Sequence, residues 1–297
     1  MNRFNMRAQL PVLPPYRLDF TADALRRLAA NVVDIVDSDG AYYRYLADGK
    51  RRSLVRAVQI DETTLEIQAS EKNDDWVLPI VSRMLGTQAD LQSWYRRSAS
   101  IPWLAYLASE LRGLKPPQYA SLWEACAHAI VFQQISIHAA ASIMRRLVER
   151  TGAPFDDFCI AFPQPHALLD APLETLREAG LSQSKVVHLR AAAEAIESGA
   201  LRDEEIAALP TPLASDRLVE VPGIGRWSAA VILLRGFGRL DIFPMKDSGV
   251  ARTVKLLCGD PHVDLPSVLD TLGPTKGMLY YHLLLGRIRN LARPSSD

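Results

Sequence analysis

The pattern of apolar and polar positions changes character near residue 75. Before that point, short stretches such as LVRAVQI (54–60) and TLEIQA (64–69) alternate apolar and polar side chains, and polar turns separate them. Alternation with a period of two is typical of strands with one buried face, and short polar connections favour antiparallel hairpins. One helical stretch, residues 21–31, interrupts them, with Thr21 as its expected N-cap. The pattern predicts a small β-rich domain with one helix over residues 1–75.

Beyond residue 75 the apolar positions recur every three or four residues, which is typical of amphipathic helices. Glycines at the ends of these stretches and prolines between them mark the expected helix boundaries. The clearest helical stretches are residues 74–86, 89–99, 102–114, 122–136 and 137–152. We therefore predict an α+β chain, in which a mostly helical domain over residues 76–297 follows the small antiparallel sheet.

The composition excludes several kinds of protein and site but does not by itself indicate a function. The 297 residues carry no net charge, so an argument for a polyanionic partner must rest on a local cluster of charge. The three cysteines, Cys126, Cys159 and Cys258, are too far apart to indicate a disulfide framework, a zinc site or a four-cysteine iron–sulfur cluster. No signal peptide and no membrane span is apparent. We expect a soluble cytoplasmic protein without a membrane partner.

One segment has the pattern of two helices joined by a tight turn. A short helix from residue 216 is stopped by Pro222, Gly223-Ile224-Gly225 follows, and a very apolar helix continues to Gly236, so the hairpin covers residues 216–236. Two glycines just before a helix N-terminus allow another molecule to approach closely, and the N–H groups there favour an anion such as a phosphodiester. Seven basic residues against three acidic ones between 217 and 255 suit a polyanion. An ordinary turn between helices is the alternative.

The segment 243–258 adds a candidate catalytic carboxylate. Asp247 lies between an apolar approach, Phe243-Pro244-Met245, and a helical run, with Lys246 and Arg252 close in sequence. An aspartate at a helix start is commonly an N-cap, and that remains the simpler alternative. A carboxylate held there also stays ionised, so it can stabilise a developing cation or activate a water.

These two motifs together resemble those of the helix-hairpin-helix DNA glycosylases, most closely the DNA-3-methyladenine glycosylase II type. VPGIGRWSA precedes FPMKDSG by about twenty residues, as in that family, and residues 121–142 and 180–185 (GLSQSK) resemble further family segments. The N-terminal sheet resembles the β-rich domain that precedes the glycosylase domain in this subfamily. The resemblance covers nearly the whole chain, with the motifs concentrated between residues 121 and 255.

The resemblance implies a monofunctional DNA glycosylase of base excision repair. It would flip alkylated bases of the 3-methyladenine or 7-methylguanine type out of double-stranded DNA and hydrolyse the N-glycosidic bond, leaving an abasic site. The essential aspartate of the family maps onto Asp247. Trp227 stands where bifunctional members carry a nucleophilic lysine, and an indole cannot form a Schiff base. Lys246 is the one nearby amine that keeps lyase chemistry open. A non-catalytic protein that binds damaged DNA on the same fold is the alternative function.

The resemblance also assigns residues to DNA and to the base pocket. Trp227 would stack on an electron-poor purine, with a core tryptophan as the alternative. Two pocket positions that are aromatic in the best-known relative are Val231 and Leu284, which Tyr280 and Tyr281 would compensate. Gln134 maps onto the residue that fills the gap left by the flipped base, unless this is a solvated turn. The DNA-contacting set is Gln133, Gln134, Pro222, Gly223, Ile224, Gly225, Arg226 and Lys246. Hairpin carbonyls would hold a sodium or potassium ion, no other cofactor is expected, and the protein is expected to be a monomer associated with the nucleoid through DNA.

Overall fold

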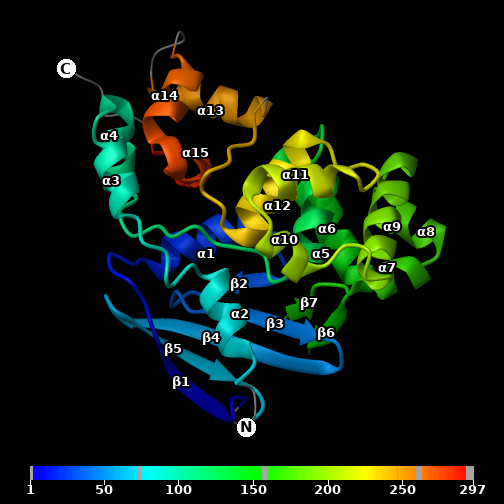
Figure 1. Ribbon diagram of the computed structural model, residues 1–297. Helices are drawn as coiled ribbons and strands as arrows, with labels where there is room; N and C mark the ends of the chain where they lie inside the picture. Colours follow the sequence, from blue (N-terminus) through cyan, green and yellow to red (C-terminus); the bar gives the residue numbers. More distant parts are fainter. Residues whose placement is uncertain (1–2, 73–74, 156–158, 246, 259–262, 292–297) are drawn as a thin grey trace.

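A five-stranded antiparallel sheet forms one side of the molecule and the helices lie over it (Figure 1). The computed structural model describes residues 3–72, 75–155, 159–245, 247–258 and 263–291. The sheet has the strand order β1-β5-β4-β3-β2. Its strands are β1 (Met6–Pro11), β2 (Asp34–Val36), β3 (Tyr42–Asp48), β4 (Arg51–Asp61) and β5 (Thr64–Ala69). The predicted α+β class, with a small antiparallel sheet before a mostly helical region, is confirmed.

The hairpins of the sheet follow the alternation seen in the sequence. β3 and β4 pair with Tyr42 opposite Ala57, and β4 returns into β5 through a two-residue turn. Val55, Ala57 and Ile67 are fully buried, as the period of two predicts. The expected helix cap is wrong. The helix begins at Leu18, and Thr21 lies inside it, where its hydroxyl donates to the carbonyl of Arg17.

Helices make up most of the chain after the sheet. The first group comprises α1 (Leu18–Arg26), α2 (Val77–Met84), α3 (Gln92–Ser98), α4 (Pro102–Glu110), α5 (Leu122–Val131) and α6 (Ile137–Thr151). The second comprises α7 (Pro165–Asp170), α8 (Leu173–Glu178), α9 (Gln183–Glu197), α10 (Asp203–Ala208), α11 (Thr211–Val219) and α12 (Arg226–Phe237). The last group comprises α13 (Ser248–Cys258), α14 (Leu265–Leu272), the 3-10 turn η1 (Gly273–Thr275) and α15 (Gly277–Ile288).

A short hairpin interrupts the helices and was not predicted. β6 (Ala153–Phe155) and β7 (Cys159–Ala161) pair with each other, and the Phe155 ring lies 5.0 Å from that of Tyr45 on β3. Strands of three residues are too short for a period of two to show, and Pro154 further weakens the strand signal. The expectation that the chain is helical throughout this region is therefore wrong.

Two apolar clusters hold these elements together, and both contain residues from before and after residue 75. The first packs the sheet against α5, α9 and α12. The second packs Phe20 and Ala24 of α1 against α3, α4, α13, α14 and α15. A buried guanidinium links the two clusters, because Arg235 of α12 donates to the carbonyls of Ala24 and Leu25 near the end of α1. The end of α1 is thereby fixed beside α12 and α15.

Candidate active site

The turn between α11 and α12 is held from inside the protein and open on its outer side. Ile224 is buried and anchors the turn in the core. Gly223 has φ +88°, and a Cβ atom there would lie 2.2 Å from Cγ of His188 on α9. Gly225 has φ −88°, and its added Cβ would meet no described atom within 4 Å. The first glycine is therefore required by the fold, and the second leaves room for another molecule.

The N-terminus of α12 has a first turn without a side-chain cap in the described chain, an arrangement that favours an anion. Gly225 is its N-cap, and no side chain of the described residues caps it. The N–H groups of a first helical turn have no partners within the helix, and the helix dipole adds partial positive charge there. Arg226 and Pro222 are exposed beside them, although Arg226 is paired with Asp216. The helix α11 begins five residues before the predicted start, because Pro212 occupies its first turn, where a proline needs no N–H partner.

Gln133 connects this turn to the one between α5 and α6. Its side-chain amide donates to the carbonyl of Gly223 at 2.8 Å and to the hydroxyl of Ser228 at 2.7 Å. The amide is thus engaged within the protein. The next residue, Gln134, is exposed and has φ +58°, a conformation that non-glycine residues seldom adopt. The two glutamines therefore have different roles, since Gln133 positions the hairpin and Gln134 projects outward.

Lys185, the last residue of the GLSQSK segment, also holds the turn between α5 and α6 through hydrogen bonds. The Lys185 ammonium donates to the carbonyls of Val131, at 2.5 Å, and Gln133, at 3.0 Å. These are carbonyls at the C-terminal end of α5, where a cation is favourable. Burial lowers the pKa of Lys185. This lysine therefore holds the glutamine turn in place.

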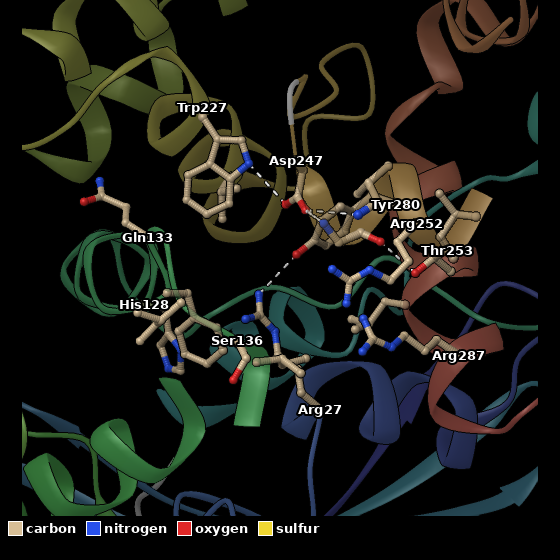
Figure 2. Close-up of a pocket in the computed structure, with 18 of the residues that line it drawn as sticks. Arg27, His128, Gln133, Ser136, Trp227, Asp247, Arg252, Thr253, Tyr280 and Arg287 are labelled. Atoms are coloured by element: carbon tan, nitrogen blue, oxygen red, sulfur yellow. Dashed lines mark hydrogen bonds between the residues drawn. The ribbon is translucent and has the colours of Figure 1, made fainter. Parts of the chain in front are cut away.

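Asp247 uses its two carboxylate oxygens for different partners (Figure 2). One oxygen, Oδ1, accepts from the backbone N–H groups of Gly249 at 2.8 Å and Val250 at 3.0 Å, which is an N-cap of α13. The other, Oδ2, accepts from the indole Nε1 of Trp227 at 3.1 Å. The capping alternative is therefore realised by one oxygen, while the second faces Trp227 across twenty residues of chain. Asp247 is half-buried and lines a cavity.

The cavity has a volume of about 910 Å³ and is enclosed by five parts of the chain. They are the end of α1, the α5–α6 turn, the start of α12, the first turns of α13 and the outer half of α15. The sequence-predicted residues that line it are Gln133, Gln134, Gly225, Trp227, Val231, Asp247, Tyr280 and Leu284. Lys246 lies outside the described residues. The structure thus brings together residues that are separated by up to 151 positions in the chain.

Tyr281 does not line the cavity, and its assignment to the pocket is wrong. Its side chain is fully buried, and its hydroxyl donates within the core, with the carbonyls of Pro117 and Leu234 each 3.0 Å away. Neighbouring residues of a helix point about 100° apart, so only Tyr280 of the pair can face the cavity. His282 is also a core residue: its ring lies 4.6 Å from that of Trp94, tilted by 42°, and its Nδ1 is hydrogen-bonded to the carbonyl of Met278.

Three arginines line the cavity, and none of them was assigned to the pocket from the sequence. Arg252 and Arg287 are exposed, while Arg27 is buried. Arg27 belongs to the N-terminal segment, and no local motif marks it. His128 lines the inner wall, where burial first, and then the charges of Arg27, Arg235 and Arg44, hold its pKa well below the usual range. His128 is therefore neutral at physiological pH.

Metal-binding side chains do not gather anywhere in the described part of the chain, where no three His, Cys, Asp or Glu residues form a group. The three cysteines are buried. None of the described helices is long and apolar enough to cross a membrane.

The sequence is similar to those of DNA repair proteins. Residues 127–269 match the model of the HhH-GPD superfamily base excision DNA repair proteins. DNA-3-methyladenine glycosylase 2 of Escherichia coli (strain K12) is 30% identical over 242 residues, which cover 77% of this chain and 80% of that protein.

Two solved structures have the same fold over almost the whole chain. The 3-methyladenine DNA-glycosylase from Archaeoglobus fulgidus has a TM-score of 0.80 at 25% identity, covering 96% of this chain and 100% of that one. An 8-oxoguanine glycosylase/lyase of Clostridium acetobutylicum, in complex with double-stranded DNA, has a TM-score of 0.74 at 18% identity, covering 97% and 99%. The second likeness shows the fold alone.

Proposed function

The chain belongs to the HhH-GPD superfamily of base excision DNA repair proteins, and from this membership we propose that it is a DNA glycosylase that removes alkylated bases by hydrolysis alone. The observation that carries the proposal is the position of the Asp247 carboxylate. Its Oδ1 caps α13, and its Oδ2 accepts from Trp227 in a large cavity next to the hairpin. An N-cap alone needs no indole partner and no cavity. The substrate class is an alkylated purine of the 3-methyladenine or 7-methylguanine type.

In the reaction, the bond between C1′ of the sugar and the base nitrogen breaks, and its electron pair leaves with the base. The sugar acquires oxocarbenium character, which a nearby carboxylate stabilises. A water then adds to C1′ and loses a proton, so the products are the free base and an abasic site. A cationic alkylated purine leaves as a neutral base and needs no general acid. Asp247 Oδ2 is the group that stabilises the sugar cation and orients the water.

The lesion reaches this carboxylate only when it is turned out of the duplex, which costs a few kcal/mol of lost stacking. We propose that Gln134, which is exposed and has φ +58°, fills the vacated position. Trp227, Val231, Tyr280 and Leu284 then form the walls around the extruded base.

Phosphate binding rests on backbone geometry and on exposed cations. Gly225 and the N-terminus of α12 give a close approach to a phosphodiester. Arg252 and Arg287 at the cavity mouth add positive charge. We propose that carbonyls of the hairpin turn, residues 222–225, hold a sodium or potassium ion that bridges to DNA; the carbonyl of Gly223 in this turn also accepts from Gln133. Replacing sodium and potassium in the buffer with a bulky organic cation, at constant ionic strength, should therefore weaken DNA binding.

The absence of lyase activity is part of the proposal. It rests on Trp227, because an indole nitrogen cannot attack C1′ of the sugar. Lys185, the lysine nearest the glutamine turn among the described residues, donates its protons to two backbone carbonyls instead. The chain should therefore leave the DNA strand intact after the base has gone.

The test is incubation of methylated duplex DNA with the protein, with mass spectrometry of released bases and strand analysis before and after alkali. The expected result is free 3-methyladenine or 7-methylguanine, strands that break only in alkali, and no protein–DNA adduct with borohydride. An adduct would show lyase chemistry and overturn the hydrolytic assignment. DNA affinity without any released base would show a non-catalytic binder.

A further inference from the structure

Lys185 is a cation on α9 whose hydrogen bonds all go to the turn between α5 and α6. It lies in the first turn of α9 and does not line the cavity. Its ammonium donates to the carbonyls of Val131 and Gln133, and it pairs with no carboxylate of the described residues. No backbone N–H in the described chain is bonded to either of these carbonyls. Lys185 is therefore the group that satisfies both of them.

The turn that Lys185 supports contains an exposed residue in a strained conformation. Gln134 has φ +58°, which costs free energy in a residue other than glycine and persists only where the surroundings determine it. The backbone contributes little, since the N–H of Gln133 donates to the carbonyl of Ile130 at a long 3.4 Å. The carbonyl of Gln133 belongs to the peptide group that leads into Gln134. The hydrogen bond from Lys185, at 3.0 Å, thus orients that peptide group.

The helix that carries Lys185 also supports the hairpin. Lys185 and His188 are three residues apart on α9, so their side chains lie on the same face of the helix. His188 packs against Gly223, where an added Cβ atom would lie 2.2 Å from Cγ of the ring. The amide of Gln133 links the two turns, because it donates to the carbonyl of Gly223 at 2.8 Å. One face of α9 therefore holds both the glutamine turn and the hairpin.

We propose that Lys185 is a positioning residue for base extrusion, because its two hydrogen bonds preform the turn that presents Gln134 to DNA. The inference rests on the proposed glycosylase function and concerns a side chain outside the cavity. A residue that is already ordered can fill the gap in the duplex without the entropy cost of ordering a flexible turn at that moment. Without Lys185 the barrier to extruding the base rises, while the contacts of the hairpin with phosphate remain.

A purely structural role for Lys185 is the alternative, since a cation at the C-terminal end of α5 also stabilises that helix. The same helix α9 contains a residue with that role alone. Arg190 donates from Nη2 to the carbonyl of Ala171, the C-cap of α7, at 2.7 Å, and neither residue lines the cavity. A helix cap changes the free energy of unfolding, whereas a positioning residue changes the rate of base release from the bound state. Arg190 is therefore the matched control.

The test measures single-turnover release of 7-methylguanine at saturating protein. Lys185→Met keeps an apolar stem of similar length and should slow release about 10- to 100-fold, as for loss of hydrogen bonds from a charged group. Its affinity for duplex DNA with an abasic-site analogue should be unchanged, because no base needs to be extruded there. The fluorescence of a 2-aminopurine beside the lesion, which rises as stacking is lost, should rise more slowly. Lys185→Arg should recover most of the rate, and Arg190→Met should release base at the rate of wild type.

A double-mutant cycle with Gln134→Gly separates positioning from folding. Glycine adopts φ +58° without strain and has no side chain to position, so Lys185→Met should add little further loss in that background. The proposal is overturned if the two losses multiply, if Lys185→Met releases base as fast as wild type or weakens DNA binding alone, or if Arg190→Met slows release as much. Failure of wild type to release any base would instead overturn the glycosylase function, and this inference with it.

Discussion

The two glycines of the hairpin should respond in opposite ways to alanine, because one faces the protein and the other faces outward. A Cβ atom at Gly223 would lie 2.2 Å from Cγ and 2.5 Å from Cβ of His188, at φ +88°. The same atom at Gly225 meets none of the described atoms within 4 Å, and its φ of −88° suits any residue. Gly223→Ala therefore tests the fold, and Gly225→Ala tests the contact with DNA.

The cost of Gly223→Ala has two parts. A side chain at positive φ costs about 1–2 kcal/mol, and forcing the His188 ring aside costs about 1–3 kcal/mol more. The sum, about 2–5 kcal/mol, lowers the melting temperature of a chain this long by roughly 3–8 °C. Gly225→Ala replaces an N-cap glycine with a poorer cap, at up to about 1 kcal/mol.

Urea denaturation followed by circular dichroism measures the first effect, and fluorescence anisotropy with duplex DNA carrying an abasic-site analogue measures the second. Gly225→Ala should fold and bind DNA about 10- to 100-fold more weakly, as for loss of a hydrogen bond to a charged group. Adding His188→Ala to Gly223→Ala should restore the part of the stability due to overlap. Equal destabilisation by both alanines, or full stability of Gly223→Ala, would refute this division.

Two further predictions concern the carboxylate's partner and a buried histidine. Trp227→Phe keeps the aromatic wall but removes the 3.1 Å donor to Asp247, so single-turnover base release should fall about 10- to 100-fold; an unchanged rate would show that the indole N–H has no part in catalysis. Burial lowers the pKa of His282 from 6.5 to about 4. The unfolded chain takes up this proton first, so stability falls as pH drops from about 6.5 to 4, by about 3 kcal/mol at pH 4. Urea titrations of His282→Gln should lack that part of the pH dependence, and a slope equal to that of wild type would contradict it.

The sheet and the main helices could be predicted because each has one buried face with a regular period. Val55, Ala57 and Ile67 are buried in the alternation that marks a strand. Predictions of helix boundaries, which depend on one or two residues, were wrong more often. Thr21 resembles a cap but donates to the carbonyl of Arg17 inside α1, and the helix expected from residue 216 begins at Thr211, with Pro212 in its first turn.

In the candidate site, the sequence indicated residues that carry local motifs and missed those placed by packing. Trp227 and Asp247 were associated through the hairpin and its spacing, and their hydrogen bond joins them directly. Tyr281 was wrongly assigned because α15 is buried on most of its faces, so apolar periodicity does not show which tyrosine faces the cavity. Arg27 had no local signal, since only the docking of α1 on α12 and α15 brings it to the cavity.

The most direct test of the account is single-turnover release of 7-methylguanine by Asp247→Asn. Asparagine keeps an oxygen that can accept from Gly249 and Val250, so the cap of α13 and the fold should persist while the negative charge is lost. Asp264→Asn removes the same charge from the N-cap of α14 and is the matched control. The account predicts release about 100- to 1,000-fold slower for Asp247→Asn, at unchanged stability, and a normal rate for Asp264→Asn. Base release by Asp247→Asn at the rate of wild type would contradict it.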